Sequence, residues 1–311
     1  MISFSVPATS ANLGSGFDSV AIALDLRMHA RAHRSLDQLH IQFSGAELPT
    51  HDGLAACIRS GMALVCTEPS ELKLSIEIEN AIPLGVGLGS SAAARLCGLL
   101  IAAESLELAL SKADVLELVA RVEGHADNAA AALHGQLCFV LHQQTNIAVL
   151  KLPFPAALRC AIVLPAQSLD TQAARNALPE LYTRRAVSSS LQAACMLAAG
   201  LASGSLEHLA ATTRDIIHQP YRAAMIPGLR DALAHSDADA CAVISGAGPS
   251  VLVISKGDPM PSASRAAQYF ERAGVSTRVQ PVAIDQCGVR AISPRRQASS
   301  SDIPRLAGAR Q

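Results

Sequence analysis

Charged residues are scarce in this sequence. Asp, Glu, Lys and Arg make up 16% of the 311 residues, below the roughly 25% typical of soluble proteins, and the net charge is −1 at pH 7. This balance excludes a strongly basic nucleic-acid-binding protein. Half of the residues are apolar, which excludes disorder over most of the chain and indicates one or two globular domains with a sizeable core.

Long apolar segments are also lacking. Runs such as residues 96–103 are shorter than the ~20 residues needed to cross a bilayer. The first ten residues, MISFSVPATS, have neither the basic nor the apolar region of a secretory signal. We therefore expect a cytoplasmic protein with neither a membrane nor a nucleic acid as partner.

The eight cysteines include no Cys-x-x-Cys pair. They are scattered singly through apolar stretches, which is typical of reduced thiols in a core and not of zinc ligands or disulfides.

Local patterns predict a strand, a glycine-rich loop and a helix in direct succession. Residues 73–80 alternate between apolar and polar side chains, which indicates a half-buried strand. An Ala- and Leu-rich helix is predicted over 91–110. A second helix should begin at Ser111 with a capping box to Asp114 and end near Gly124, and a short helix should follow and end at Gly135.

The second half of the chain should begin with strands. Strands are predicted over 137–151 and 159–165, around Pro153 and Pro155, where the chain could pass between domains. The predicted division is a first domain at 1–155, a second at 156–292 and a flexible tail at 293–311.

Helices and a hairpin should follow. Helical periodicity dominates 188–234 with interruptions at Gly204 and Pro220, and a glycine turn at 246–249 should join two strands as a hairpin.

The glycine-rich loop at 83–91 is the first candidate site. The amino terminus of a helix carries unpaired N–H groups and partial positive charge, so a glycine loop that enters one suits phosphate. The loop lacks the lysine of a Walker motif and the glycine spacing of a dinucleotide fingerprint. The paired hydroxyls of Ser90 and Ser91 favour a functional role, because such hydroxyls commonly bind Mg²⁺ beside phosphates.

Three further stretches contain small or chemically versatile residues. They are a glycine-containing loop at 7–18, a carboxylate, imidazole and amide together at 123–128, and a glycine turn at 245–250. Each alone has an ordinary structural explanation as a loop, a helix cap or a turn.

In this order, the four motifs resemble the GHMP kinase superfamily, and within it the homoserine kinase family. The stretches at 170–179 and 215–228 extend the resemblance, which spans residues 3 to about 290. It implies an α+β, two-domain GHMP kinase fold, with an N-terminal domain like ribosomal protein S5 domain 2, a ferredoxin-like C-terminal domain and the site between them. The activity implied is ATP-dependent phosphorylation of the L-homoserine hydroxyl to O-phospho-L-homoserine, a step of threonine biosynthesis.

The resemblance also implies a set of substrate-binding residues. Homoserine is a zwitterion with a primary hydroxyl, so it needs a cation, an anion and polar groups around the hydroxyl. Arg175 and Arg222, with Thr171 nearby, would bind the carboxylate, and Asp18 would bind the ammonium. The residues expected around the hydroxyl are Asn12, His125 and Asn128.

For ATP and Mg²⁺, the resemblance implies a metal held by Ser91 and Glu123, with Glu117 as a reserve ligand. Asn12, Asn128 and Glu123 are the expected catalytic residues, and Asn128 stands where some relatives have a basic aspartate, so no strong general base is expected. The predicted ATP-binding residues are Pro83, Leu84, Gly85, Val86, Gly87, Leu88, Gly89, Ser90, Ser91, Ala92 and Ala93.

Three alternatives stay open at this point. Another small-molecule kinase of the superfamily, such as mevalonate kinase, would need a lysine in the stretch at 7–18 and a basic aspartate, neither of which is found. A catalytically inactive nucleotide-binding relative would not need both arginines and both asparagines. A dinucleotide-dependent oxidoreductase is disfavoured by the loop spacing. Relatives of this kind are often homodimers, so a homodimer is a possible assembly.

Overall fold

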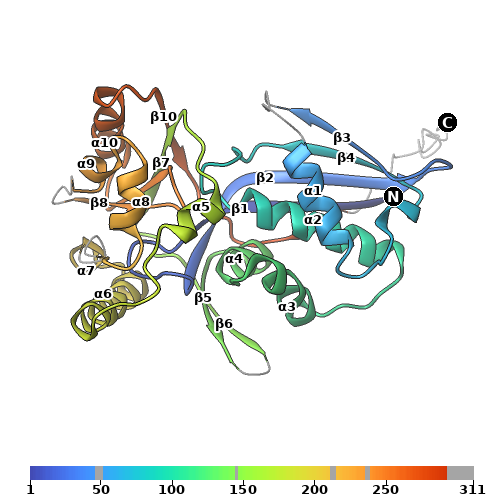
Figure 1. The fold of residues 1–311 in the computed structure, drawn as a ribbon, viewed down its shortest axis with the longest axis horizontal. Helices are drawn as coiled ribbons and strands as arrows, with labels where there is room; N and C mark the ends of the chain where they lie inside the picture. The colour runs from blue at the N-terminus through green and yellow to red at the C-terminus, as the bar shows by residue number, and fades with distance from the viewer. Residues whose placement is uncertain (46–51, 144–145, 211–214, 235–238, 293–311) are drawn as a thin grey trace, which may run out of the picture.

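Two β-sheets, each with its own helices, form the molecule in the computed structural model (Figure 1). The structure describes residues 1–45, 52–143, 146–210, 215–234 and 239–292. The predicted tail at 293–311 lies outside the described residues.

The first sheet is mixed. Its strand order is β11-β1-β2-β4-β3, with β5 paired to β2 and β6 paired to β5. All pairs are antiparallel except β3 with β4, which are parallel. The strands are β1 (Ile2–Ala11), β2 (Val20–Arg34), β3 (His40–Gly45), β4 (Leu74–Asn80), β5 (Leu137–His142), β6 (Ile147–Leu152) and β11 (Arg290–Ala291).

Helices α2 and α4 pack on this sheet, and α1 and α3 pack on α2. Helix α2 ends before the predicted residue 110, because Glu107 adopts a left-handed backbone with φ 57°. The capping box of Ser111 and Asp114 is confirmed, as is the end of α3 at Gly124. The bounds are α1 (Asp52–Met62), α2 (Ser90–Ser105), α3 (Lys112–Glu123) and α4 (Asp127–His134), with a 3₁₀ turn η1 (Pro69–Glu71).

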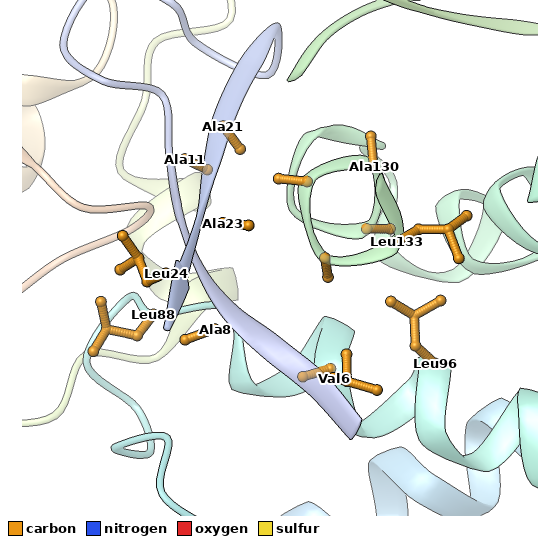
Figure 2. Packing of buried hydrophobic residues seen from close by; sticks show 14 of the residues in the cluster. Val6, Ala8, Ala11, Ala21, Ala23, Leu24, Leu88, Leu96, Ala130 and Leu133 are labelled. Carbon is orange, nitrogen blue, oxygen red and sulfur yellow. The ribbon is translucent and has the colours of Figure 1, made fainter. Parts of the chain in front are cut away.

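Small residues let α2 lie deep in the core. A Cβ atom on Gly98 would lie 2.0 Å from the Ile58 carbonyl oxygen, and one on Gly61 would lie 2.1 Å from the Arg95 carbonyl oxygen, so α1 and α2 cross in backbone contact. Figure 2 shows the alanine side chains of β1 and β2 near Ala130 and Leu133 of α4. The close approach holds the middle of α2 against α1, and the first residue of α2, Ser90, directly follows the glycine loop.

The second sheet has the order β10-β7-β9-β8 and is antiparallel throughout. Along the chain its elements follow a β-α-β-β-α-β pattern, which together with this order is the predicted ferredoxin-like arrangement. The predicted hairpin is confirmed by the pairing of β8 with β9. The strands are β7 (Arg159–Pro165), β8 (Ala240–Ile244), β9 (Val251–Ser255) and β10 (Thr277–Val282).

Both faces of the second sheet are covered. Cys160, Ile162 and Leu164 of β7 belong to the core cluster shared with the first sheet, whereas Ala161 and Val163 face α9 and α10. Alternation between two buried faces explains why these strands are continuously apolar in sequence. The division 1–155, 156–292 stays a proposal. One strand crosses it, because β11, near the end of the second segment, pairs with β1 of the first sheet.

The predicted interruption at Pro220 is confirmed, because residues 215–218 are not helical and a new helix, α8, begins at Gln219. Pro220 lies in the first turn of α8, where a residue without an N–H leaves no helical hydrogen bond unmade. The predicted break at Gly204 is confirmed, because Gly204 ends α6 with φ 67°. The helices here are α5 (Thr171–Asn176), α6 (Arg184–Ser203), α7 (Leu206–Ala210), α8 (Gln219–Met225), α9 (Leu229–Ala234) and α10 (Met260–Arg272).

Among the described residues, α6 alone has the length and apolar composition of a membrane-crossing helix. Leu197 and Leu201 of this helix belong to the main core cluster, and Gly200 contacts Leu209 of α7. One face of α6 is therefore packed against protein, as in a surface helix of a folded domain.

The cysteines only partly match the prediction of core thiols. All eight are free, and Cys97, Cys138, Cys160 and Cys241 are buried. Cys195 and Cys287 are exposed, so for these two the prediction is wrong.

Candidate active site

A cavity of about 600 Å³ lies where the four sequence motifs meet. Its walls come from the loop after β1, the glycine loop before α2, the turn between α3 and α4, α5, α8 and the turn between β8 and β9. Most of the predicted site residues line it: Asn12, Asp18, Gly85, Gly87, Leu88, Gly89, Ser90, Ser91, Ala92, Glu123, His125, Asn128, Thr171, Arg175 and Arg222.

Some predicted residues lie elsewhere. Val86 and Ala93 are buried in the main core cluster, and Pro83 and Leu84 are not among the cavity residues in the described part of the chain. The reserve ligand Glu117 is likewise not in the cavity wall and pairs with Arg121 at 3.9 Å.

The glycines of the phosphate loop are required by close backbone contacts. Gly87 and Gly89 have φ values of 81° and 68°, which favour glycine. A Cβ on Gly87 would lie 2.2 Å from the Ser245 carbonyl oxygen, and one on Gly89 would lie 2.0 Å from the Thr9 hydroxyl. The loop thus lies tightly between the stretch at 7–18 and the glycine turn at 245–250.

Hydrogen bonds hold these segments together. The Ser245 hydroxyl donates to the Gly87 carbonyl at 2.8 Å, and the Thr9 amide donates to the Leu88 carbonyl at 3.1 Å. Helix α2 begins after Gly89 with no side-chain cap. Ser90, Ser91 and Ala92 of its first turn line the cavity, and the unpaired amide groups of a first helical turn are suited to bind phosphate oxygens.

Asp18 and Arg175 form a bidentate ion pair at the cavity wall. The two guanidinium nitrogens of Arg175 donate to the two carboxylate oxygens of Asp18, both at 2.9 Å. The hydrogen bonds to Asp18 raise the pKa of Arg175. A fixed anion and a fixed cation therefore stand side by side, about a third of each side chain being exposed.

Arg222 is far more buried, with 2% of its surface exposed. Its Nη1 donates to the Gly246 carbonyl at 2.9 Å, and its Nε has no hydrogen-bond partner. Burial and the nearby Arg175 lower the pKa of Arg222 to about 10. Both guanidinium groups lie 5.4 Å from the centre of the Phe17 ring, which keeps the two cations on a common aromatic support.

A buried histidine and aspartate, His218 and Asp215, position Arg222. Because a guanidinium only donates, His218 accepts from Arg222 through Nδ1 at 3.2 Å and donates from Nε2 to the Gly14 carbonyl at 2.6 Å. Burial lowers the pKa of His218 to about 4, which keeps the ring neutral. Asp215 accepts the amide hydrogens of His218 and Gln219 at the start of α8.

His125, Asp127 and Asn128 meet at the start of α4. The Nδ1 of His125 donates to Asp127 at 2.7 Å, and the Asn128 side-chain oxygen accepts from the Thr9 hydroxyl at 2.6 Å. Burial lowers the pKa of His125, but the contact with Asp127 outweighs it, so the net effect is a raised pKa.

Asn12 links the stretch at 7–18 to the glycine turn at 245–250 by a hydrogen bond. Its amide nitrogen donates to the Gly246 carbonyl at 2.8 Å, and its oxygen accepts from the Asp18 amide at 3.0 Å. Asn12 is 4% exposed and has φ 71°. In this geometry its amide positions Asp18 as well as lining the cavity.

The predicted metal ligands lie together. The Ser91 hydroxyl donates to Glu123 at 3.1 Å, so the two groups present hard oxygen donors on one side of the glycine loop. Mg²⁺ is commonly held by one or two such protein oxygens together with substrate phosphates, and this pair fits that role. Asp18, His125 and Asp127 also place potential ligand atoms within 4.8 Å of one another, but these are engaged with Arg175 and with each other.

Sequence reasoning missed several residues of this site. Arg95 contacts both Ser91 and Glu123, while Phe17 and His218 support the arginines. Asp127 and His218 lie within the motif stretches at 123–128 and 215–228, and their place in these stretches could have identified them as site residues. Arg95 had none, because a lone arginine on an alanine-rich helix is ordinary.

Known proteins resemble this chain over most of its length. The family described as GHMP kinases N terminal domain matches residues 56–136. The homoserine kinase of Solibacter usitatus is 38% identical over 80% of this chain and 83% of its own, and that of Lactiplantibacillus plantarum is 34% identical over 93% and 99%.

Solved structures agree with these relatives. The homoserine kinase of Cytophaga hutchinsonii superposes with a TM-score of 0.77 at 27% identity, covering 94% of this chain and 97% of the other. A mevalonate kinase from L. major, at 13% identity and a TM-score of 0.68 over 91% and 95% of the two chains, shares the fold. The predicted two-sheet α+β GHMP kinase fold is confirmed. With relatives of this identity over most of their own length, the chain belongs to the homoserine kinase family of the GHMP kinases.

Proposed function

We propose that the protein transfers the terminal phosphoryl group of ATP to the side-chain hydroxyl of L-homoserine, yielding O-phospho-L-homoserine for threonine biosynthesis. The observation that carries this proposal is the Asp18–Arg175 pair in the same cavity as the glycine loop. An α-amino acid carries ammonium and carboxylate on one carbon, so its receptor needs an anion and a cation side by side. Membership of the homoserine kinase family supports the same substrate.

Substrate binding follows from the charges in the cavity. Arg175 and Arg222 bind the carboxylate, and Asp18 binds the ammonium. A guanidinium recognises a carboxylate through two parallel hydrogen bonds, which fixes its orientation as well as its position. Thr171, at the start of α5, borders this end of the cavity.

The hydroxyl is placed toward the phosphate loop by Asn12, Asn128 and His125. A raised pKa favours the protonated form of His125, whose ring nitrogens donate hydrogen bonds, so it suits hydrogen bonding to an oxygen and not removal of the proton. Phosphoryl transfer of this kind depends mainly on positioning and on neutralising the phosphate charge, so no strong base is needed.

ATP is held by the residues that line the cavity: those of the glycine loop, Gly85, Gly87, Leu88 and Gly89, and those of the first turn of α2, Ser90, Ser91 and Ala92. Ser91 and Glu123 are the residues that would hold Mg²⁺, which neutralises charge on the transferred phosphate when bound.

A substrate panel tests the proposal. ADP release should be followed with L-homoserine, mevalonate, galactose and shikimate at equal concentrations, and only L-homoserine should be turned over rapidly. Turnover of mevalonate or galactose in its place would identify another kinase of the superfamily. ADP binding with no turnover of any of the four would indicate an inactive nucleotide-binding relative.

Two broader expectations complete the proposal. We propose a cytoplasmic location, which the free cysteines support. A homodimer is proposed because relatives of this kind are often homodimers. Sedimentation equilibrium of the purified chain tests it.

A further inference from the structure

Arg95 occupies the place where the metal ligands converge. It follows Ser91 by one helical turn on α2, and its Nη1 donates to both the Ser91 hydroxyl and the Glu123 carboxylate. Because Ser91 also donates to Glu123, the three groups form a closed cluster. The Ser91 and Glu123 oxygens, which are suited to a divalent cation, are therefore already bridged by the guanidinium cation of Arg95.

Arg95 differs from an ordinary surface ion pair. Its side chain is 18% exposed and that of Glu123 is 11% exposed, whereas Arg121 on the same cavity wall is 74% exposed. Low exposure strengthens the attraction between Arg95 and Glu123, because water screens it less. The Nε of Arg95 is buried without a hydrogen-bond partner, so the guanidinium has an unused donor.

The backbone beneath Arg95 cannot move aside. Its carbonyl oxygen would be 2.1 Å from a Cβ on Gly61, which shows how closely α1 presses on α2 at this residue. Helix α2 is also bounded by the glycine loop at its start. The guanidinium can therefore leave Ser91 and Glu123 only by rotation of its own side chain.

We propose that Arg95 is a positioning residue that competes with the divalent metal for Ser91 and Glu123. This inference rests on the proposed function, because it takes these two residues as the metal ligands. A metal ion and a guanidinium cannot both contact the same carboxylate oxygen without strong repulsion. Metal binding requires Arg95 to turn away, so Arg95 reduces metal affinity and holds Glu123 in position before the metal arrives.

Binding of Mn²⁺ alone, with no nucleotide, tests the competition by electron paramagnetic resonance. In R95M and R95Q, loss of the competing cation should tighten Mn²⁺ binding by about fivefold or more relative to the wild type. R95K keeps the charge but cannot bridge both oxygens, so it should show a smaller gain. In R95M/E123Q the gain should disappear, because the liberated carboxylate is gone.

The matched control is R121M, which removes an exposed arginine from the same cavity wall and should leave Mn²⁺ affinity unchanged. Equal, weaker or unmeasurable Mn²⁺ binding by both R95M and R95Q, with circular dichroism showing that they are folded, would overturn the inference. The Mn²⁺ measurement needs no homoserine turnover. Failure of the wild type to phosphorylate homoserine would therefore refute the proposed function separately.

Discussion

The carboxylate of Asp18 and the guanidinium of Arg175 meet in two parallel hydrogen bonds, each 2.9 Å long. An amino acid that enters the cavity carries one negative and one positive group. Its carboxylate pairs with Arg175, and its ammonium pairs with Asp18. Substrate binding then replaces one ion pair, between Asp18 and Arg175, by two ion pairs, one from each of these residues to the substrate. The gain depends on both charges of the substrate, which favours an α-amino acid over a hydroxy acid or a sugar.

Loss of the arginines should weaken homoserine binding. R175M and R222M each remove a charge-assisted contact worth about 1.5–3 kcal/mol, so the KM for homoserine should rise by roughly 10- to 100-fold while the KM for ATP changes little. Steady-state kinetics with each substrate varied in turn measures this. R184M, at an exposed residue on α6, is the matched control. An unchanged homoserine KM in both cavity variants would contradict the carboxylate assignment.

The glycine loop should tolerate no side chain at Gly87. In G87A the new methyl would meet the Ser245 carbonyl and the backbone would be held at an unfavourable positive φ. We expect weaker ADP binding by isothermal titration calorimetry and a lower Tm. The control is G257A, since a Cβ at Gly257 meets nothing within 4 Å. Wild-type ADP affinity in G87A would show that the loop is looser than the structure indicates.

A buried ion pair fastens the end of the described chain to the first sheet. Arg27 and Asp285 pair with almost no exposure, and Asp285 also accepts the amide hydrogens of Cys287 and Gly288. In D285A the Arg27 charge would stay buried without its partner, which should lower the free energy of unfolding by about 3–5 kcal/mol. Urea denaturation measures this.

The control for D285A is E117Q, which removes an exposed i,i+4 pair with Arg121 and should cost under about 0.5 kcal/mol. Similar losses in the two variants would show that burial of the Arg27 pair carries no special weight.

Acid should destabilise the protein through His218. Burial holds its folded-state pKa at about 4, below the ordinary value of 6.5, so the unfolded chain takes up this proton first as the pH falls. The resulting stability is complete above about pH 6.5 and is lost toward pH 4, at up to about 1.4 kcal/mol per pH unit. Asp215 and Arg222, which contact the ring, modulate the size of the effect.

Urea denaturation at pH 7.5 and pH 5.0 measures the acid effect. The wild type should lose more stability between the two values than H218Q, which cannot take up the proton. Equal losses in the two proteins would show that other groups govern the acid sensitivity.

Local sequence determined much of this protein. The alternation over 73–80, the glycine loop and the capping box of Ser111 are short-range features, set by backbone dihedral preferences and by which face of an element is apolar. The family resemblance then located most of the cavity residues. Where local reasoning erred, as at the end of α2, the cause was also local, since Glu107 adopts a left-handed backbone that the apolar pattern does not reveal.

Tertiary structure alone decided which charges meet. Asp18 and Arg175 are 157 residues apart, and His218 reaches the Gly14 carbonyl across 204 residues. Arg95 became part of the site only because α2 and α3 present it to Glu123. Such contacts depend on how two sheets and their helices pack around one core, and a pattern of neighbouring residues contains no information on the distance between segments that are remote along the chain.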